Sequence, residues 1–253
     1  MPAILRYFRR PLKTALLAPD DVHVWWAAIA PPPQSLPGML SLLSTDEKAR
    51  AQRFHFERHR LRYIAGRACL RLLLGDYLGL DPAQIEFEYS PLGKPGLKTD
   101  PDGRVLQFNL SNSEERALYV FSWQRLVGVD LELAHALPEE DDFARQFFCE
   151  TEYTLLHSLS GEEKSRTFFE FWTCKEALLK AMGSGLTTPI NQVEVAIQPG
   201  SARLVAIAGD PLPAADWQLS LFRPAPAYQA ALAVSGRSFN TTFFNATDEF
   251  SPE

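Results

Sequence analysis

The sequence predicts an α+β fold composed of two similar α+β halves related by a pseudo-twofold axis, with a ligand site at their junction. The chain has 253 residues and a hydrophobic content of 46%, which is enough for one large core or two smaller ones. The same order of elements occurs twice, over residues 44–97 and 168–200: a helix, a Gly-Leu turn, an alternating strand and a Pro-Gly turn. Pseudo-symmetric halves commonly bind ligands between them.

The division between the halves is expected at the crossover formed by residues 121–128. Residues 1–125 are then the N-terminal α+β half, and residues 126–236 are the C-terminal α+β half. Residues 237–253 are expected to form a mobile tail, as chain ends commonly do.

The N-terminal half begins with a strand over residues 21–30, because three prolines follow it and cannot supply the amide donors that a sheet needs. Ser44 and Glu47 have the spacing of a capping box, which predicts a helical region from there to about residue 80. Residues 85–89 then alternate between apolar and polar side chains, as in a half-buried strand.

The C-terminal half contains a helix over residues 168–182 and several alternating segments that predict strands. These strands are expected at residues 127–133, 193–197, 217–222 and 228–234.

The helix at residues 168–180 (FFEFWTCKEALLK) is apolar on most of its circumference, which predicts that it is buried. At about 100° per residue, Thr173, Glu176 and Lys180 lie on one narrow polar stripe. Lys175 projects from within the apolar arc. The alternative is that Glu176 and Lys180 form an ordinary i,i+4 pair on a solvated face.

Apolar side chains occupy every second position of residues 127–133 (VGVDLEL), as in a strand with one buried face. Asp130 and Glu132 then share the other face of the strand, about 7 Å apart. Two carboxylates side by side in a cleft repel each other unless a cation lies beside them. All the ligands offered are oxygens, which favours Mg²⁺ completed by phosphate oxygens and water. The alternative is a polar outer face of an amphipathic strand.

Two further segments carry groups that can bind an anionic ligand. Gly93, Lys94 and Pro95 follow a strand, where glycine lets the backbone approach a ligand and the ammonium can meet a phosphate. Residues 108–113 (FNLSNS) end in hydroxyl and amide groups that can hydrogen-bond to an anion. The spacing is not that of a Walker loop, so hydrolysis of nucleoside triphosphates is disfavoured. A plain surface turn is the alternative for residues 93–95.

Charge and cysteine content limit the function further. The net charge of −6 argues against nucleic acid as a partner, because phosphate backbones are bound by basic faces. The three cysteines have no paired spacing, which predicts reduced thiols. We find no segment with the apolar length of a signal peptide or a membrane span, so we expect a cytoplasmic protein with no membrane partner.

Four motifs occur in order: GKP at residues 93–95, FNLSNS at 108–113, GVDLE at 128–132 and WTCKEALLK at 172–180. Together they resemble those of the 4′-phosphopantetheinyl transferases of the longer, surfactin-synthetase-activating type, with overall similarity closest to cyanobacterial members. The resemblance implies two pseudo-symmetric halves that bind coenzyme A and Mg²⁺ at their junction. It also implies transfer of the 4′-phosphopantetheine arm from coenzyme A to a serine of apo carrier proteins, with release of 3′,5′-ADP.

The same resemblance assigns the site residues. Asp130, Glu132 and Glu176 are the metal-site carboxylates, and Glu176 and Lys180 are the catalytic residues. Residues that would contact coenzyme A are Arg50, Arg62, Gly93, Lys94, Pro95, Ser111, Asn112, Lys175 and Lys180, with Lys175 and Lys180 facing the pyrophosphate. Catalysis of phosphoryl transfer consists of positioning and of neutralising charge on oxygens, which suits these residue types.

The chain departs from the family pattern at Asn112, where members usually carry His. Asparagine can donate to a phosphate oxygen but cannot titrate, so we assign it a binding role and no acid or base role. Glu47 lies near a position that is often basic in relatives, which leaves Lys48 or Arg50 to serve there.

Two other functions stay open at this point. Another Mg²⁺-dependent, nucleotide-utilising transferase would keep the carboxylates without needing coenzyme A. A non-catalytic carrier-binding protein would keep the fold but lose the carboxylate triad, which is intact here. We expect a monomer, and the sequence does not distinguish the acyl, polyketide and peptidyl carriers of fatty acid, polyketide and nonribosomal peptide biosynthesis.

Overall fold

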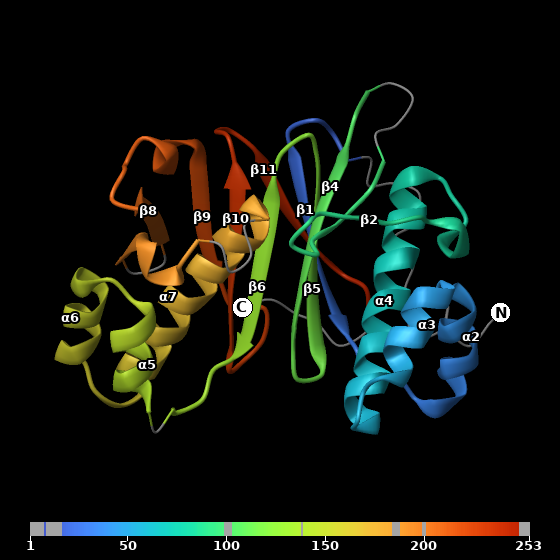
Figure 1. The fold of residues 1–253 in the computed structure, drawn as a ribbon, viewed down its shortest axis with the longest axis horizontal. Helices are drawn as coiled ribbons and strands as arrows, with labels where there is room; N and C mark the ends of the chain where they lie inside the picture. The colour runs from blue at the N-terminus through green and yellow to red at the C-terminus, as the bar shows by residue number, and fades with distance from the viewer. Residues whose placement is uncertain are drawn as a thin grey trace.

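The computed structural model describes residues 8, 17–98, 103–137, 139–183, 188–198 and 201–247. It has a mixed α+β fold in which two sheets pack face to face between two groups of helices (Figure 1). The mixed fold confirms the predicted class. The pseudo-twofold axis and the boundary between residues 125 and 126 stay predictions.

The first sheet has the strand order β11-β1-β5-β4. Its strands are β1 (Asp21–Ala28), β4 (Leu106–Ser113), β5 (Arg116–Trp123) and β11 (Asn240–Asn245). The helices on its outer face are α2 (Leu36–Leu42), α3 (Thr45–Gln52) and α4 (Glu57–Leu78). A two-stranded hairpin, β2 (Glu88–Tyr89) and β3 (Pro95–Gly96), lies between α4 and β4 in the sequence.

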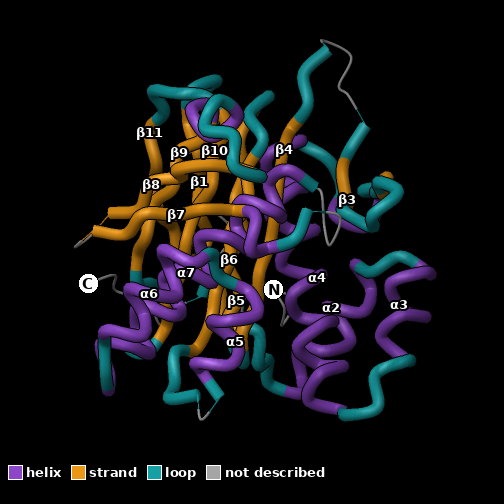
Figure 2. The backbone as a smooth tube through the Cα atoms, turned by 60° about the vertical axis from the view of Figure 1, so that its left-hand side comes forward, coloured by secondary structure: helices purple, strands orange, loops and turns teal. Residues whose placement is uncertain are grey.

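The second sheet is antiparallel, with the order β6-β10-β9. Its strands are β6 (Val127–Leu133), β9 (Trp217–Phe222) and β10 (Tyr228–Ser235). The hairpin of β7 (Val193–Gln198) and β8 (Ser201–Ile207) lies beside β9 (Figure 2). The outer face carries α5 (Glu140–Phe147), α6 (Glu150–Ser158) and α7 (Gly161–Met182). Short 3₁₀ turns occupy Pro33–Ser35, Pro82–Gln84, Ile190–Gln192 and Pro213–Asp216.

The core between the two sheets follows from the alternation of β6. Val127, Val129 and Leu131 are buried against the first sheet, in one cluster with residues of β1, β5 and β10. Successive side chains of a strand point to opposite faces, so Asp130 and Glu132 lie on the other face, toward α7. The predicted sharing of a face by these two carboxylates is confirmed.

The helical region expected to run from Ser44 to about residue 80 is divided in the structure. The capping box is present, since the Ser44 amide donates to Glu47 Oε2 at 3.0 Å, but α3 ends at Gln52 and α4 begins at Glu57. The break lets α3 fold back against α4. Glu47, only 1% exposed, therefore accepts bonds from Arg67 and Arg71 of α4.

The C-terminal segment also differs from the prediction. Residues 240–245 pair in parallel with β1, and the Ala28 amide donates to Thr247 Oγ1 at 3.0 Å. The prediction of a mobile tail is therefore wrong for residues 240–247, and residues 248–253 lie outside the described residues. The strand expected at residues 85–89 is present only as Glu88–Tyr89.

A helix that crosses a bilayer needs about 20 consecutive, predominantly apolar residues. Within the described ranges, we find no helix that is both long and apolar enough to cross a bilayer.

Gly128 sets the distance between β6 and α7. A Cβ at this position would lie 2.1 Å from the Ala177 carbonyl oxygen and 2.5 Å from the Ala181 amide nitrogen. Both neighbours are backbone atoms of α7, so neither can move as a side-chain end could. The helix can pack this closely only because residue 128 has no side chain.

We predict that Gly128→Ala lowers the free energy of unfolding by about 3 kcal/mol or prevents folding, because overpacking against backbone cannot relax. Urea denaturation measures the change. Gly66→Ala in α4 is the matched control, because its Cβ would meet only Tyr119 Oη at 3.7 Å, and alanine favours a helix by about 0.5–1 kcal/mol over glycine. Equal stability of the Gly128 variant and the unaltered protein would contradict the close approach.

Candidate functional site

A cavity of about 590 Å³ lies where the β2–β3 hairpin, β4, α5 and the second half of α7 meet. It is lined by Gly93, Lys94 and Pro95 of the hairpin and by Glu176 and Lys180 of α7. These residues are far apart in the sequence, and each was predicted as a site residue. The cavity therefore brings together the GKP turn and the polar stripe of the helix.

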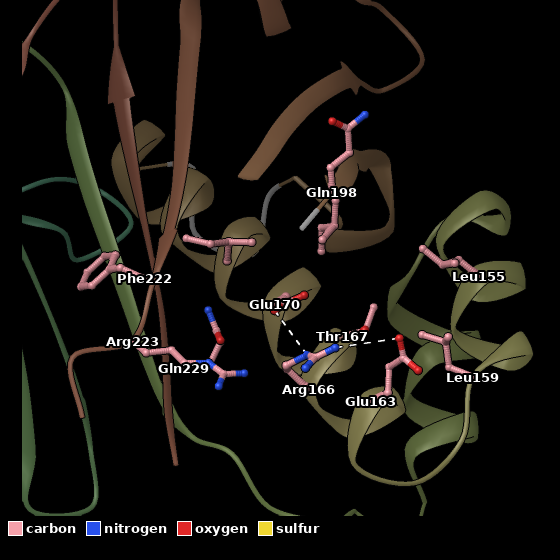
Figure 3. A pocket seen from close by; sticks show the side chains of 12 residues that line it. Leu155, Leu159, Glu163, Arg166, Thr167, Glu170, Gln198, Phe222, Arg223 and Gln229 are labelled. Atoms are coloured by element: carbon pink, nitrogen blue, oxygen red, sulfur yellow. Dashed lines mark ion pairs between the residues drawn. The ribbon is translucent and has the colours of Figure 1, made fainter. Parts of the chain in front are cut away.

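Two other cavities, of about 590 and 780 Å³, lie at the opposite end of α7 and share Arg166, Arg223 and Gln229 in their walls. Figure 3 shows the first of them, in which Arg166 faces Glu163 and Glu170, each at 3.9 Å. Neither cavity is lined by a predicted site residue. We therefore place the candidate site in the cavity that contains Lys94.

Lys180 connects that cavity to the carboxylates of β6. Its Nζ lies 2.5 Å from Asp130 Oδ1 and 2.9 Å from Ser111 Oγ, and Ser111 Oγ also lies 2.9 Å from Asp130 Oδ1. Asp130 is only 3% exposed. Its second oxygen, Oδ2, is buried and has no hydrogen-bond partner among the described residues.

The other two carboxylates lie within electrostatic reach of Asp130. Burial, followed by the charge of Asp130, raises the pKa of Glu132 to about 7, although the hydrogen bond from Ser113 opposes the shift. Burial and the charge of Asp130 also raise the pKa of Glu176, and Lys180 opposes this. Like charges held in a buried place favour the entry of a cation.

The chemistry of these side chains fits a hard metal ion. All their donors are oxygens, and Asp130 Oδ2 is a buried oxygen that lacks a partner. Among residues 17–98, 103–137, 139–183, 188–198 and 201–247, no three His, Cys, Asp or Glu side chains are already grouped closely enough to share a metal. The site thus offers suitable ligands without a preformed cluster.

Lys94 links the hairpin to the end of α7. Its Nζ donates to the Ala181 carbonyl at 2.7 Å, and burial lowers the pKa of Lys94 to about 8. The turn that carries it is closed by bonds from the Ser90 amide to the Lys94 carbonyl and from the Gly93 amide to the Ser90 carbonyl. Gly93 has a φ of 82°, a left-handed conformation that favours glycine.

Lys175 lies elsewhere. Its side chain is fully buried, and Nζ lies 2.6 Å from Glu152 Oε2 of α6 and donates to the Val193 and Ile190 carbonyls at 2.6 and 3.2 Å. These contacts use its ammonium donors. The predicted contact of Lys175 with a pyrophosphate is therefore not available in this structure, and the residue holds α6 and the start of β7 against α7.

The remaining predicted residues lie outside the cavity wall. Arg62 pairs with Glu114 at 2.8 Å, Arg50 lies over the ring of Tyr63, and Asn112 is exposed near the end of β4. Ser111, Asp130 and Glu132 do not line the cavity either. Ser111 and Asp130 are nevertheless connected to the cavity wall, because both form hydrogen bonds with Lys180.

The structure adds residues that the sequence reasoning missed. Phe147 and Trp172 form an apolar wall of the cavity, with ring centroids 5.7 Å apart. Ser113 donates to Glu132, a contact that the period of two in the strand could have suggested, since Ser111 and Ser113 share a face. No local signal identifies Glu152, which lies 23 residues before Lys175.

Known proteins match this chain along most of its length. The family model described as the 4′-phosphopantetheinyl transferase superfamily matches residues 126–233, and the one described as 4′-phosphopantetheinyl transferase, N-terminal, matches residues 26–121. The 4′-phosphopantetheinyl transferase HetI of Nostoc is 39% identical over 236 residues, which are 93% of this chain and 96% of that protein.

More distant relatives cover less of the chain. A putative 4′-phosphopantetheinyl transferase of Synechocystis is 38% identical over 62% of this chain and 64% of its own length. Among solved structures, a holo-(acyl-carrier-protein) synthase from Bacillus anthracis, in complex with CoA (3′,5′-ADP), is 19% identical. The structural match covers 44% of this chain and 96% of the Bacillus anthracis protein, and its TM-score is 0.37.

We predict that Lys175→Met lowers the free energy of unfolding by about 3–5 kcal/mol, because Glu152 would keep a buried charge without its partner. Thermal or urea denaturation measures this. Lys164→Met is the matched control: Lys164 pairs with Asp141 at 2.7 Å, but Asp141 is 48% exposed, so the loss should stay below about 1 kcal/mol. A Lys175 variant of unaltered stability that bound coenzyme A more weakly would restore the pyrophosphate role.

Proposed function

The chain belongs to the 4′-phosphopantetheinyl transferase superfamily, and from this premise we propose that it transfers the 4′-phosphopantetheine arm of coenzyme A to a serine of apo carrier proteins. The released product would be 3′,5′-ADP. The proposal is carried by the position of Lys180. This residue lines one cavity together with Lys94 and Glu176, and it also contacts the buried carboxylate of Asp130.

The proposed reaction is a phosphoryl transfer. The serine oxygen attacks the phosphorus that bears the pantetheine arm, and the bond from this phosphorus to the bridging oxygen of the pyrophosphate breaks. The bridging oxygen leaves with the electron pair as part of 3′,5′-ADP, and the serine proton passes to a base. Such reactions depend on positioning and on stabilising charge at the oxygens.

Two residues of α7 suit the chemical step. Glu176 lines the cavity and can take the serine proton directly or through one water. Lys180 also lines the cavity, and its ammonium would stabilise negative charge on the pyrophosphate. Because both residues lie on one face of one helix, four positions apart, their spacing is fixed by the helix itself.

Asp130, Glu132 and Glu176 are the residues that would hold Mg²⁺. When bound, this ion would neutralise charge on the phosphate oxygens. The unpartnered Oδ2 of Asp130 supports this assignment. Lys180 already provides one positive charge beside Asp130 Oδ1, so the carboxylates are partly balanced before any other cation arrives.

The wider coenzyme A site is proposed on the same basis. Lys94, with Gly93 and Pro95, would meet the adenosine end, and its ammonium would exchange the Ala181 carbonyl for a ligand oxygen. Further phosphate contacts are proposed for Arg50, Arg62 and Asn112, and for Ser111 if its hydroxyl proton turns from Asp130 to the ligand. Arg62 would have to exchange its exposed partner Glu114, which costs little because exposed ion pairs are worth about 0–1 kcal/mol.

Incubation with coenzyme A, Mg²⁺ and several apo carrier proteins tests the proposal, with mass spectrometry detecting addition of the arm. A carrier whose acceptor serine is replaced by alanine is the control and should stay unmodified. If no carrier of the acyl, polyketide or peptidyl type gains the arm, although calorimetry shows that coenzyme A binds, the transferase assignment fails.

We predict that Glu176→Gln reduces the transfer rate by at least about 100-fold, because glutamine keeps the size of the side chain but removes its charge and basicity. Coenzyme A should still bind, which calorimetry measures. Glu170→Gln on the same helix is the matched control, because Glu170 lines a different cavity, and its rate should stay unaltered. Transfer by the Glu176 variant at the unaltered rate would show that this helix is structural only.

A further inference from the structure

Alternate side chains of β4 hydrogen-bond to β6 where the two sheets meet. Asn109 Oδ1 accepts from the Val129 amide at 3.1 Å, Ser111 Oγ donates to Asp130 Oδ1 at 2.9 Å, and Ser113 Oγ donates to Glu132 Oε2 at 3.0 Å. One face of β4 therefore contacts both carboxylates of β6.

The direction of the Ser113 bond follows from the chemistry of both its partners, because the ionised Glu132 carboxylate can only accept. The Leu133 amide donates to Ser113 Oγ at 3.0 Å, and an amide N–H can only donate. The hydroxyl has one proton of its own, so this proton is free to point to Glu132. Ser113 thus presents a donor to Glu132 while being held in place by the backbone of β6.

Ser111 is arranged in the same way beside Asp130. Lys180 Nζ donates to Ser111 Oγ, and an ammonium can only donate, so the serine proton points to Asp130 Oδ1. In both pairs a donor-only group occupies one lone pair of the hydroxyl oxygen, and an ionised carboxylate accepts the hydrogen bond from its proton. The two serines therefore act as oriented donors to neighbouring carboxylates that repel each other.

We propose that Ser113 is a positioning residue for the metal-binding carboxylate Glu132. Its hydroxyl holds Oε2 and so leaves Oε1 of the same carboxylate for a cation. Ligating carboxylates commonly need such partners, and their loss typically costs about 10–100-fold in metal affinity or activity. The inference rests on the proposed function, because it takes Glu132 as a metal ligand.

Two substitutions and a control test the role. Ser113→Ala removes the hydroxyl, and Ser113→Thr keeps it with a β-branched side chain that strands accept. Ser122→Ala is the control: Ser122 is a buried serine of the neighbouring strand β5 that donates to the Asp21 carbonyl at 2.9 Å and touches neither carboxylate. All variants are first compared in thermal stability.

Calorimetry with Mn²⁺, which takes the same oxygen ligands as Mg²⁺, measures metal affinity in the presence of coenzyme A. We expect Ser113→Ala to weaken Mn²⁺ binding by about 10–100-fold, Ser113→Thr to restore it to within about threefold, and Ser122→Ala to leave it unaltered. In the transfer assay, Ser113→Ala should raise the Mg²⁺ concentration for half-maximal rate, with a smaller change in the rate at saturating Mg²⁺.

The outcomes separate this inference from the proposed function. If Ser113→Ala lowers stability as much as Ser122→Ala does and leaves Mn²⁺ affinity unaltered, Ser113 is only structural and the inference is overturned. If the unaltered protein binds no divalent metal, the inference is also overturned. If it binds Mn²⁺ and coenzyme A but modifies no carrier, the transferase proposal fails, and the Mn²⁺ affinities of the variants still decide the role of Ser113.

Discussion

The direct packing of α7 on the backbone of β6 at Gly128 is the constraint on which the site depends. Helix and strand approach so closely that no side chain fits between them at this point. Because α7 is rigid, this contact also fixes the positions of Glu176 and Lys180, which lie within the same two turns as Ala177 and Ala181. Lys180 then meets Asp130, two residues along β6 from Gly128.

Two groups of buried charges in the described part of the chain differ in how far their charges are compensated. Glu47 with Arg67 and Arg71, and Lys175 with Glu152, are ion pairs with further hydrogen bonds, as buried charges must be to persist. The group around Asp130 is different, because acidic side chains outnumber their cationic partner and one oxygen has no partner. Incomplete compensation of this kind is typical of functional sites.

The junction of the two sheets combines apolar packing with polar contacts. On one face of β6, valine and leucine side chains are buried against the first sheet, and the other face presents Asp130 and Glu132 to serines of β4. A strand can do both because its side chains alternate. The same alternation that builds the core therefore supplies oriented carboxylates at its edge, beside the cavity formed with α7 and the β2–β3 hairpin.

The sequence by itself determined the elements with a strong local period: the strand at 127–133, with Asp130 and Glu132 on one face, and the buried helix at 168–182. Tertiary structure alone decided the ion-pair partners of two lysines of α7. Lys175 and Lys180 lie on one helix, yet Lys175 meets Glu152 and Lys180 meets Asp130, because packing directs them to different neighbours. The C-terminal strand at 240–245 was missed for the same reason, since its pairing with β1 joins segments distant in the sequence.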